Sequence, residues 1–216
     1  MPLTLFLDGY FVNPWDAVVY VALEEKQLPY STVRALLRDG GGVPQALASQ
    51  TRIPRIPALQ HDEFWLTESM AIVEYLEQVF PPPGYARLYP AEPRARGRAR
   101  QIMAFMRSGL NSLRDEVQWW MCVYPHDVVT LSPKAARDAH ELVDLVEQLD
   151  ASGELAEWNL AHVDLAFMLS RLERSEVALP ASARGVVDDN FARPAVRAYL
   201  DHPRPPNPPP RSLADG

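Results

Sequence analysis

The residues best placed to do chemistry lie between positions 55 and 69, where a proline-containing strand precedes a carboxylate and a hydroxyl. Pro57 follows Ile56 in an apolar run, and a proline before a hairpin predicts a sheet edge or a bulge and is often cis. Glu68 and Ser69 open an amphipathic helix, whose first N–H groups attract anions. Backbone N–H groups and these two side chains can converge on one ligand, which predicts a binding site for a small peptide-like molecule.

The segments that must position these residues alternate between strand and helix over the first 80 positions. Apolar patterns predict strands at 3–7, 30–37, 56–59 and 64–66, and helices at 14–26, 43–49 and 69–80. This βαβαββα order predicts a thioredoxin-like α/β domain with a mixed sheet and helices on both faces. A dithiol oxidoreductase would carry Cys-x-x-Cys at the first strand–helix turn, where this chain instead has Asn13, Pro14, Trp15 and Asp16.

The rest of the chain has a helical pattern. Five prolines and one glycine between 81 and 93 have the composition of a linker. Apolar periodicity predicts helices at 95–116, 133–149 and 160–172, the last of which is apolar almost all round and therefore buried. We expect an α/β domain at 1–80, a linker at 81–93, an all-α domain at 94–201 and an extended or disordered proline-rich tail at 202–216.

Composition limits the classes of function. The chain has 216 residues and a net charge of −7, so it lacks the basic character of a nucleic-acid-binding surface. Its single cysteine, Cys122, is typical of a reducing compartment, and neither a secretory signal nor an apolar run long enough to span a membrane is present. The histidines show no metal-ligand spacing, and the glycines at 40–42 lack the lysine of a phosphate-binding loop. We expect a cytoplasmic protein with no metal and with neither nucleic-acid nor membrane partners.

Several motifs resemble one family. The I-P-x-L strand at 56–59 followed by E-S-x-A-I at 68–72 resembles the glutathione-binding half of the cytosolic glutathione S-transferases. The likeness covers roughly residues 3–200. The segments QTRIPRIPAL, LTESMAIVEYLE and HVDLAFMLSRL most resemble the bacterial YfcF-like branch. The resemblance implies the glutathione transferase fold, with a thioredoxin-like domain followed by an all-helical domain, and a homodimer.

The resemblance also implies how the glutathione thiol becomes a thiolate. A donor at the start of the first helix, under the positive end of its dipole, lowers a thiol pKa. Related bacterial enzymes most often have Ser there, and this chain has Asn13, with Tyr10 as a second candidate donor. Asn13 is equally well explained as a helix N-cap alone, because Asn is among the preferred N-cap residues.

The resemblance assigns the rest of glutathione, the co-substrate, to the proline strand and the following helix. Ile56 would bond the cysteinyl part through its backbone, with Pro57 fixing that geometry. Glu68 would pair with the γ-glutamyl ammonium, Ser69 would bind the carboxylate beside it, and Arg55 could reach the glycyl carboxylate. The alternatives are an ordinary edge strand, helix capping and a solvated arginine.

The second substrate, a small hydrophobic electrophile or a peroxide, would need an apolar slot beside the sulfur. Adjacent bulky residues at the end of a long helix cannot both face one core, which favours positions 119 and 120, although most buried aromatic residues are simply core. The candidates are Phe11, Trp15, Met106, Trp119, Trp120 and Tyr124.

The start of the helix at 160–172 departs from the family pattern. Family members usually have Ser or Thr there, followed three residues later by Asp, which forms a reciprocal capping box. Here Asn159 can still cap the helix, but His162 replaces the acid.

Two functions follow. The first is a glutathione transferase acting in detoxification or stress response, with a glutathione-dependent peroxidase as a variant of the same site. The second is a non-catalytic protein-interaction module of the same fold, because Asn13 and His162 both depart from the family pattern. An interaction module has no reason to retain the glutathione-binding set, so the transferase is favoured.

Overall fold

The computed structural model describes residues 2–35 and 44–207 and divides into two compact units. The N-terminal unit joins Met1–Arg87 with Ala198–Gly216, and the helical unit is Leu88–Arg197. Some of the expectations lie outside the described residues: the end of the strand at 30–37, the glycines at 40–42, the start of the helix at 43–49, and the part of the tail at 208–216.

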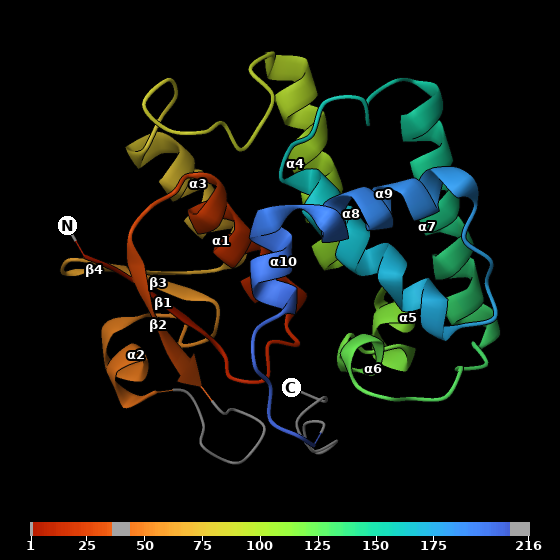
Figure 1. The fold of residues 1–216 in the computed structure, drawn as a ribbon, viewed down its shortest axis with the longest axis horizontal. Coiled ribbons are helices and arrows are strands. Elements are labelled where there is room, and N and C mark those ends of the chain that lie inside the picture. The colour runs from red at the N-terminus through yellow and green to blue at the C-terminus, as the bar shows by residue number, and fades with distance from the viewer. Residues whose placement is uncertain (1, 36–43, 208–216) are drawn as a thin grey trace. The chain divides into compact units, whose positions relative to one another are not determined.

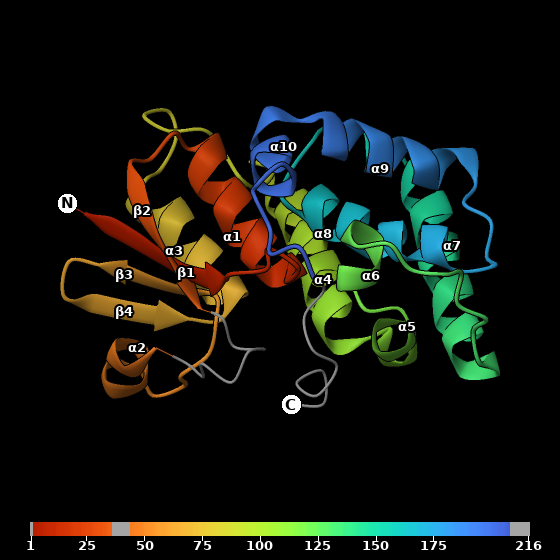
Figure 2. The same cartoon turned by 60° about the horizontal axis from the view of Figure 1, so that its bottom comes forward.

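The N-terminal unit has the predicted thioredoxin-like order. Its elements are β1 (Leu3–Asp8), α1 (Pro14–Glu25), β2 (Tyr30–Ala35), α2 (Gln45–Gln50), β3 (Ala58–His61), β4 (Phe64–Thr67) and α3 (Ser69–Val79). The strand order is β2-β1-β3-β4; β1 pairs in parallel with β2 and antiparallel with β3, and β3 pairs antiparallel with β4. Figures 1 and 2 show α1 and α3 on one face of the sheet and α2 on the other.

Strand β1 explains why both faces of the sheet are covered. Successive side chains of a strand point to opposite faces, and Phe6 packs in a cluster with Leu47 of α2 and Ala58 of β3. Leu5 and Leu7 therefore face the other side, towards α1 and α3, and both are fully buried. The almost continuous apolar run of β1 is what a strand buried on both faces requires.

A buried lysine joins the end of α1 to α3. The Lys26 ammonium donates to Glu77 Oε2 (2.7 Å) and to the carbonyls of Phe80 (2.9 Å) and Ala86 (2.8 Å). The Lys26 side chain is fully buried, and its three donors are all used. These contacts hold the segment that follows α3 against the core of the N-terminal unit.

The helical unit is organised around a buried helix. Its elements are α4 (Pro93–Ser108), α5 (Asn111–Glu116), α6 (Trp120–Val123), α7 (Pro133–Ala151), α8 (Ala161–Leu169), the 3₁₀ helix η2 (Ser170–Arg174), α9 (Ala181–Ala192) and the first part of α10 (Pro194–Leu200), whose residues from Ala198 on belong to the N-terminal unit. Every residue of α8 is buried, and the helix packs against α4 and α9, as its apolar composition predicts. Among the helices that the structure describes, none is long and apolar enough to cross a membrane.

The single helix expected at 95–116 is wrong, because the chain breaks into α4 and α5 at Gly109 and Leu110. A β-carbon at Gly109 would lie 2.5 Å from Phe105 Cε2, so a larger residue there would require the Phe105 ring to move, and Leu110 has a left-handed backbone with φ 56°. Arg114 Nη1 donates to the carbonyl of Arg107 (2.7 Å), which satisfies an acceptor left free at the end of α4. Apolar periodicity continues across the break and does not reveal it.

The start of the tail also differs from expectation, since residues 202–207 are described and two of them pack against the N-terminal unit. The His202 ring stacks on Phe11 with 4.0 Å between ring centroids, and Arg204 donates to the Phe11 carbonyl (3.4 Å). The His202 ring and the Arg204 side chain thus make contacts that the proline-rich composition of the tail does not predict.

Candidate functional site

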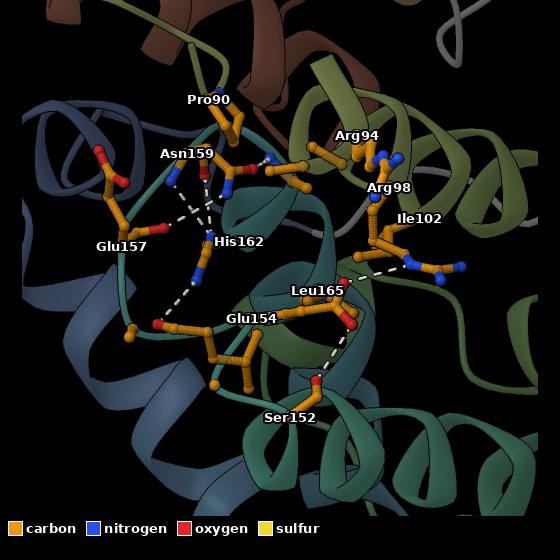
Figure 3. A pocket seen from close by; sticks show the side chains of 16 residues that line it. Pro90, Arg94, Arg98, Ile102, Ser152, Glu154, Glu157, Asn159, His162 and Leu165 are labelled. Atoms are coloured by element: carbon orange, nitrogen blue, oxygen red, sulfur yellow. Dashed lines mark hydrogen bonds and ion pairs between the residues drawn. The ribbon is translucent and has the colours of Figure 1, made fainter. Parts of the chain in front are cut away.

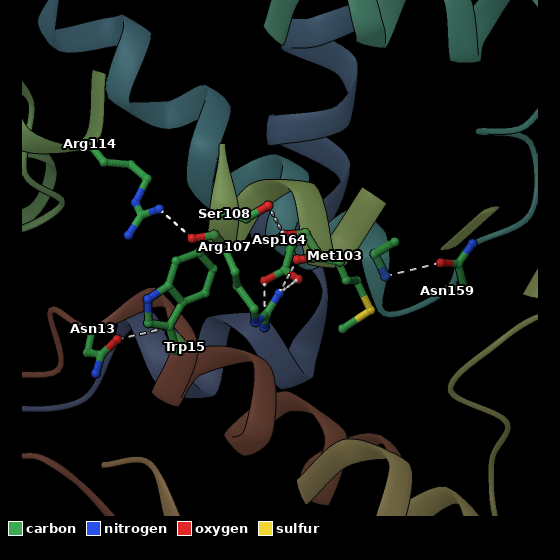
Figure 4. Close-up of polar contacts among 10 residues, drawn as sticks. Asn13, Trp15, Met103, Arg107, Ser108, Arg114, Asn159 and Asp164 are labelled. Carbon is green, nitrogen blue, oxygen red and sulfur yellow. Dashed lines mark hydrogen bonds and ion pairs between the residues drawn. The ribbon is translucent and has the colours of Figure 1, made fainter. Parts of the chain in front are cut away.

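Asn13 caps α1, as one of the two interpretations of this residue predicted. Its side-chain oxygen accepts from the backbone N–H of Trp15 (3.0 Å; Figure 4), and Pro14 occupies the first helical position. Its amide nitrogen donates to Asp16 Oδ1 (3.0 Å). A primary amide has two N–H bonds, so the cap and the Asp16 contact leave the second N–H as a donor beside the positive end of α1.

Asp16 is a site residue that the sequence interpretation missed. It is fully buried, and its second oxygen accepts from the backbone N–H of Asp8 at 2.6 Å. One carboxylate therefore links the end of β1 to the side chain of Asn13 and fixes the orientation of the Asn13 amide. The signal was present, because an acid in the first turn of a helix is favoured by the helix dipole.

The loop between β1 and α1 also contains Tyr10 and Phe11, both of which are buried. Phe11 has φ 52°, a left-handed conformation that costs an aromatic residue about 1–3 kcal/mol. Tyr10 stays a predicted second donor, and its burial leaves little of the side chain exposed to a ligand in solution.

Pro57 lies immediately before β3 rather than within it, and the Ile56–Pro57 peptide bond is cis. The strand predicted from position 56 begins at Ala58, which pairs with Phe6 and Thr67. The backbone of Ile56 therefore lies outside the ladder, and its side chain packs on the cluster of Phe6 and Leu47. The binding of the cysteinyl part of glutathione by the Ile56 main chain stays a prediction.

Glu68 and Ser69 have an unusual geometry at the start of α3. Glu68 has φ 70° and ψ 112°, a conformation that a non-glycine residue adopts at a cost of about 1–3 kcal/mol and that recurs at ligand clamps. Its side chain makes no capping hydrogen bond to α3, so helix capping does not explain it. Ser69, the first residue of the helix, is buried.

The Glu68 carboxylate faces solvent beside Arg55. Arg55 Nη1 lies 3.6 Å from Glu68 Oε1, and both side chains are more than half exposed. An exposed ion pair of this kind contributes about 0–1 kcal/mol. Both charges are therefore available to a charged ligand without loss of a strong internal contact.

The six residues predicted to line a second-substrate slot are mostly core. Phe11 is fully buried in the N-terminal unit, and Met106 in the helical unit. The argument that Trp119 and Trp120 cannot both be buried is wrong: α4 and α5 end before them, so they lie in a separate turn and in α6. Trp119 packs on Phe167 and donates to Ser170, Trp120 donates to Gln118, Tyr124 is buried, and Trp15 is half-buried.

The helical unit has a cavity of about 560 Å³ between the first half of α4 and the start of α8 (Figure 3). Arg98 pairs with Glu154 at its rim (3.2 Å), and His162 lines it. All six predicted slot residues are described, and none of them lines this cavity. The aromatic content of the sequence therefore did not locate it.

The start of α8 carries the capping box that the sequence suggested only in part. Asn159 Oδ1 accepts from Ala161 N–H (3.0 Å), and His162 Nδ1 accepts from Asn159 N–H (3.2 Å). His162 Nε2 lies 3.3 Å from the Leu155 carbonyl, which fits a neutral ring protonated at Nε2. Burial lowers the pKa of His162 below 6.5, so the neutral imidazole takes the part of the usual acid.

Asp164 and Cys122 are further titratable residues of the helical unit, and both have a raised pKa. Arg107 donates to Asp164 and to the Met103 carbonyl (Figure 4). Burial raises the pKa of the Asp164 carboxyl, and Arg107 opposes that rise. Burial raises the pKa of the Cys122 thiol to about 11, so this cysteine is protonated at neutral pH and is a poor nucleophile. In the described part of the chain no three acids, histidines or cysteines are grouped to hold a metal ion.

Comparison with known proteins decides the family. The family described as "Glutathione S-transferase, N-terminal domain" matches residues 1–78. A maleylacetoacetate isomerase from Pseudomonas aeruginosa is 32% identical over 206 residues, which cover 88% of this chain and 93% of that protein. The chain belongs to the glutathione S-transferase family. The fold and family that the sequence motifs implied are therefore confirmed.

Other members of the glutathione S-transferase family match over different lengths. A maleylacetoacetate isomerase from Mus musculus is 34% identical over 111 residues, so the match covers 50% of this chain and the chain spans about half the length of that relative. The crystal structure of a glutathione transferase homolog from Burkholderia, with bound glutathione, is 29% identical with a TM-score of 0.76. It covers 93% of this chain and 97% of its own.

Proposed function

We propose that this protein is a glutathione transferase that binds glutathione in the N-terminal unit and stabilises its thiolate for attack on a small electrophile. The observation that carries this proposal is the backbone of Glu68, which is left-handed at φ 70° immediately before the buried Ser69. Helix capping does not account for it, because the Glu68 side chain makes no capping bond. A clamp on a zwitterionic amino-acid group accounts for both the strain and the uncommitted carboxylate.

The γ-glutamyl end of glutathione meets this clamp. Glu68 pairs with its ammonium, and the Ser69 hydroxyl together with the first N–H groups of α3 binds its carboxylate. Arg55 lies 3.6 Å from Glu68, a position that favours contact with this carboxylate over the glycyl one. The backbone of Ile56, outside the β3 ladder, bonds the cysteinyl amide.

Asn13 then acts on the sulfur. A free thiol has a pKa of about 8.5, and each unit of lowering corresponds to about 1.4 kcal/mol of preferential thiolate stabilisation. The second N–H of the Asn13 amide donates to the thiolate at the positive end of α1, and the thiol proton leaves to solvent. The sulfur forms a bond to the electrophilic carbon, and the leaving group departs with its electron pair.

A second candidate reaction is isomerisation. The Pseudomonas aeruginosa relative, which this chain matches over 88% of its length, is named a maleylacetoacetate isomerase. The same thiolate can add to a conjugated double bond, allow rotation about the resulting single bond, and be eliminated again. Product formation without consumption of glutathione distinguishes this reaction from transfer.

Peroxide reduction would use the same site with a different outcome. The thiolate attacks the peroxide oxygen, a second glutathione completes the disulfide, and the products are an alcohol and water. Measurement of glutathione disulfide identifies this activity. A non-catalytic interaction module would give none of the three reactions.

The cellular context stays a prediction: a cytoplasmic enzyme of detoxification or stress response, in the bacterial YfcF-like branch. The predicted homodimer has support in exposed apolar side chains of the N-terminal unit, where Phe64 is 48%, Val79 41% and Tyr85 40% exposed. Light scattering at several protein concentrations tests it.

Calorimetry with glutathione tests the proposed function. We expect micromolar to low-millimolar binding by the wild-type protein and a loss of at least about tenfold in affinity in Ser69→Ala, which corresponds to about 1.4 kcal/mol. Ser31→Ala is the matched control, because that exposed hydroxyl lies in the same unit and bonds the Thr4 hydroxyl (3.1 Å) at the surface. Absence of binding at several-millimolar glutathione would refute the transferase and favour the interaction module.

A further inference from the structure

The last turn of α10 and the residues that follow it contact the loop that precedes α1, within the N-terminal unit. The Tyr199 hydroxyl donates to the Asn13 carbonyl (3.0 Å), and Arg204 Nε and Nη2 each lie 3.4 Å from the Phe11 carbonyl, to which they donate. The His202 ring stacks on the Phe11 ring. Three residues near the end of the described chain thus contact the loop that carries the proposed thiolate donor.

These contacts surround a backbone that needs support. Phe11 has φ 52°, and such a conformation persists in a bulky residue only where the surrounding structure holds it. Its fully buried ring lies against His202 and Tyr199, and the Arg34 guanidinium lies 5.0 Å from the ring centroid. Arg34 Nη2 is 3.0 Å from His202 Nδ1. Burial and the two arginines lower the pKa of His202, so a neutral ring stacks on Phe11 and accepts from Arg34.

The same contacts act on Asn13 through its main chain. The Asn13 side chain is oriented by Trp15 N–H and Asp16, while its carbonyl accepts from Tyr199 and from the N–H groups of the first turn of α1. Tyr199 is fully buried, so its hydroxyl has a fixed position. A residue 186 positions later in the sequence therefore contacts the main chain of Asn13, whose side chain is the proposed thiolate donor.

We propose that Tyr199 and Arg204 are positioning residues of the thiolate site. They hold the Phe11 and Asn13 carbonyls so that the free N–H of the Asn13 amide points at the glutathione sulfur, and they make no contact with glutathione themselves. This inference rests on the proposed function of Asn13. It predicts an effect on the thiol pKa and on kcat, with glutathione affinity retained.

The test uses variants of the full chain that remove the donor groups of one side chain each. Tyr199→Phe loses one hydroxyl and keeps the ring on Phe11. Arg204→Met loses both donors to the Phe11 carbonyl, together with the bonds from Nη1 to the Leu200 (2.6 Å) and His202 (3.5 Å) carbonyls. Tyr75→Phe is the matched control for the first, because it loses a hydroxyl bonded to His61 (2.8 Å) elsewhere in the same unit. Arg87→Met is the control for the second, since Arg87 is exposed and lies in the same unit.

The thiol pKa of bound glutathione is measured by titrating the ultraviolet absorbance of the thiolate, alongside calorimetry and kcat with chlorodinitrobenzene. In each of the two variants we expect the thiol pKa to rise by about one unit, which is a tenfold loss of thiolate below the pKa, and kcat at neutral pH to fall correspondingly. The dissociation constant of glutathione should change by less than about twofold. Arg204→Lys, which keeps a donor, should recover part of the loss.

Failure of this inference and failure of the proposed function are distinguishable. If the wild-type protein neither binds glutathione nor lowers its thiol pKa, the proposed function fails, and this inference fails with it. If the wild-type protein lowers the thiol pKa and Tyr199→Phe and Arg204→Met behave as their controls do, the inference alone is overturned. Hydrogen exchange of the amides at 9–13 adds a readout without ligand: it should be faster in the two variants than in the controls.

Discussion

At the scale of single residues, Asn13 uses one amide group for three tasks. Its oxygen caps α1, one N–H donates to Asp16, and the other is proposed to donate to the glutathione sulfur. A serine at this position would have one hydroxyl proton, with no second donor to bond an acid. The buried Asp16 is therefore the partner that makes an asparagine workable here, because it fixes the plane of the amide.

Replacing Asn13 separates its structural role from its chemical role. Asn13→Ala should lower the free energy of unfolding by about 1 kcal/mol through loss of the cap, and raise the thiol pKa of bound glutathione through loss of the donor. Asn13→Ser keeps an acceptor and a donor, so it should restore most of both properties. Urea denaturation and the thiolate titration measure them. If the thiol pKa is unchanged in Asn13→Ala, Asn13 is a helix cap and no more.

The strain at Glu68 predicts opposite effects on stability and binding. Glu68→Gly relieves about 1–3 kcal/mol of backbone strain and costs about 0.5–1 kcal/mol of chain entropy, so the free energy of unfolding should rise by up to about 2.5 kcal/mol. Glutathione binding should weaken, because the carboxylate is gone. Glu68→Gln is the control: it should weaken binding without gaining stability. A destabilised Glu68→Gly would mean that the backbone is not strained.

At the scale of elements, the capping pair of α8 links a helix start to the core. Asn159→Ala removes the acceptor for Ala161 N–H at the start of a helix whose every residue is buried. We expect a loss of about 1 kcal/mol in the free energy of unfolding. Asn111→Ala, which changes an exposed residue of α5, is the control. An unchanged melting curve for Asn159→Ala would rule out the capping role.

The other half of the capping pair predicts a pH dependence. His162 has a lowered pKa in the folded protein, chiefly through burial and in part through Arg193, so the folded state resists protonation. The unfolded chain binds the proton near pH 6.5, so stability should fall as the pH falls below about 6.5, until the lower folded pKa is reached. Denaturation between pH 7.5 and pH 5 should show a smaller fall in His162→Gln. The exposed His140→Gln should behave like the wild-type protein in the same experiment.

The elements that were predictable have signals within a few residues. The start of the N-terminal unit was predictable from the apolar run of β1 and from Pro14 at the first helical position. The candidate site was predicted from Pro57 and Ser69. The break between α4 and α5 at Gly109 was not predicted, because the apolar periodicity continues across it. The contacts of Tyr199 and Arg204 could not be predicted for a different reason. Their partners lie in the loop that precedes α1, and no local sequence pattern connects the two segments.

At the scale of the whole molecule, Lys26 shows how the N-terminal unit holds the segment that follows α3. Its ammonium bonds Glu77 and the carbonyls of Phe80 and Ala86. Lys26→Ala leaves the buried Glu77 charge without the Lys26 ammonium, so the free energy of unfolding should fall by about 3–5 kcal/mol. The double variant Lys26→Met/Glu77→Leu should lose less, because neither charge remains. Equal losses in the single and double variants would show that packing, and not the ion pair, determines the effect.

The N-terminal unit is discontinuous in sequence, because Ala198–Gly216 completes what Met1–Arg87 begins. On a ribosome, the sheet and the residues around Pro57 and Ser69 emerge long before Tyr199 and Arg204 are added. A nascent chain therefore already has the residues proposed to bind glutathione, while the loop that carries Asn13 still lacks its contacts with Tyr199 and Arg204. A chain stalled before position 199 would have the proposed ligand-binding residues without the contacts that support the proposed thiolate donor.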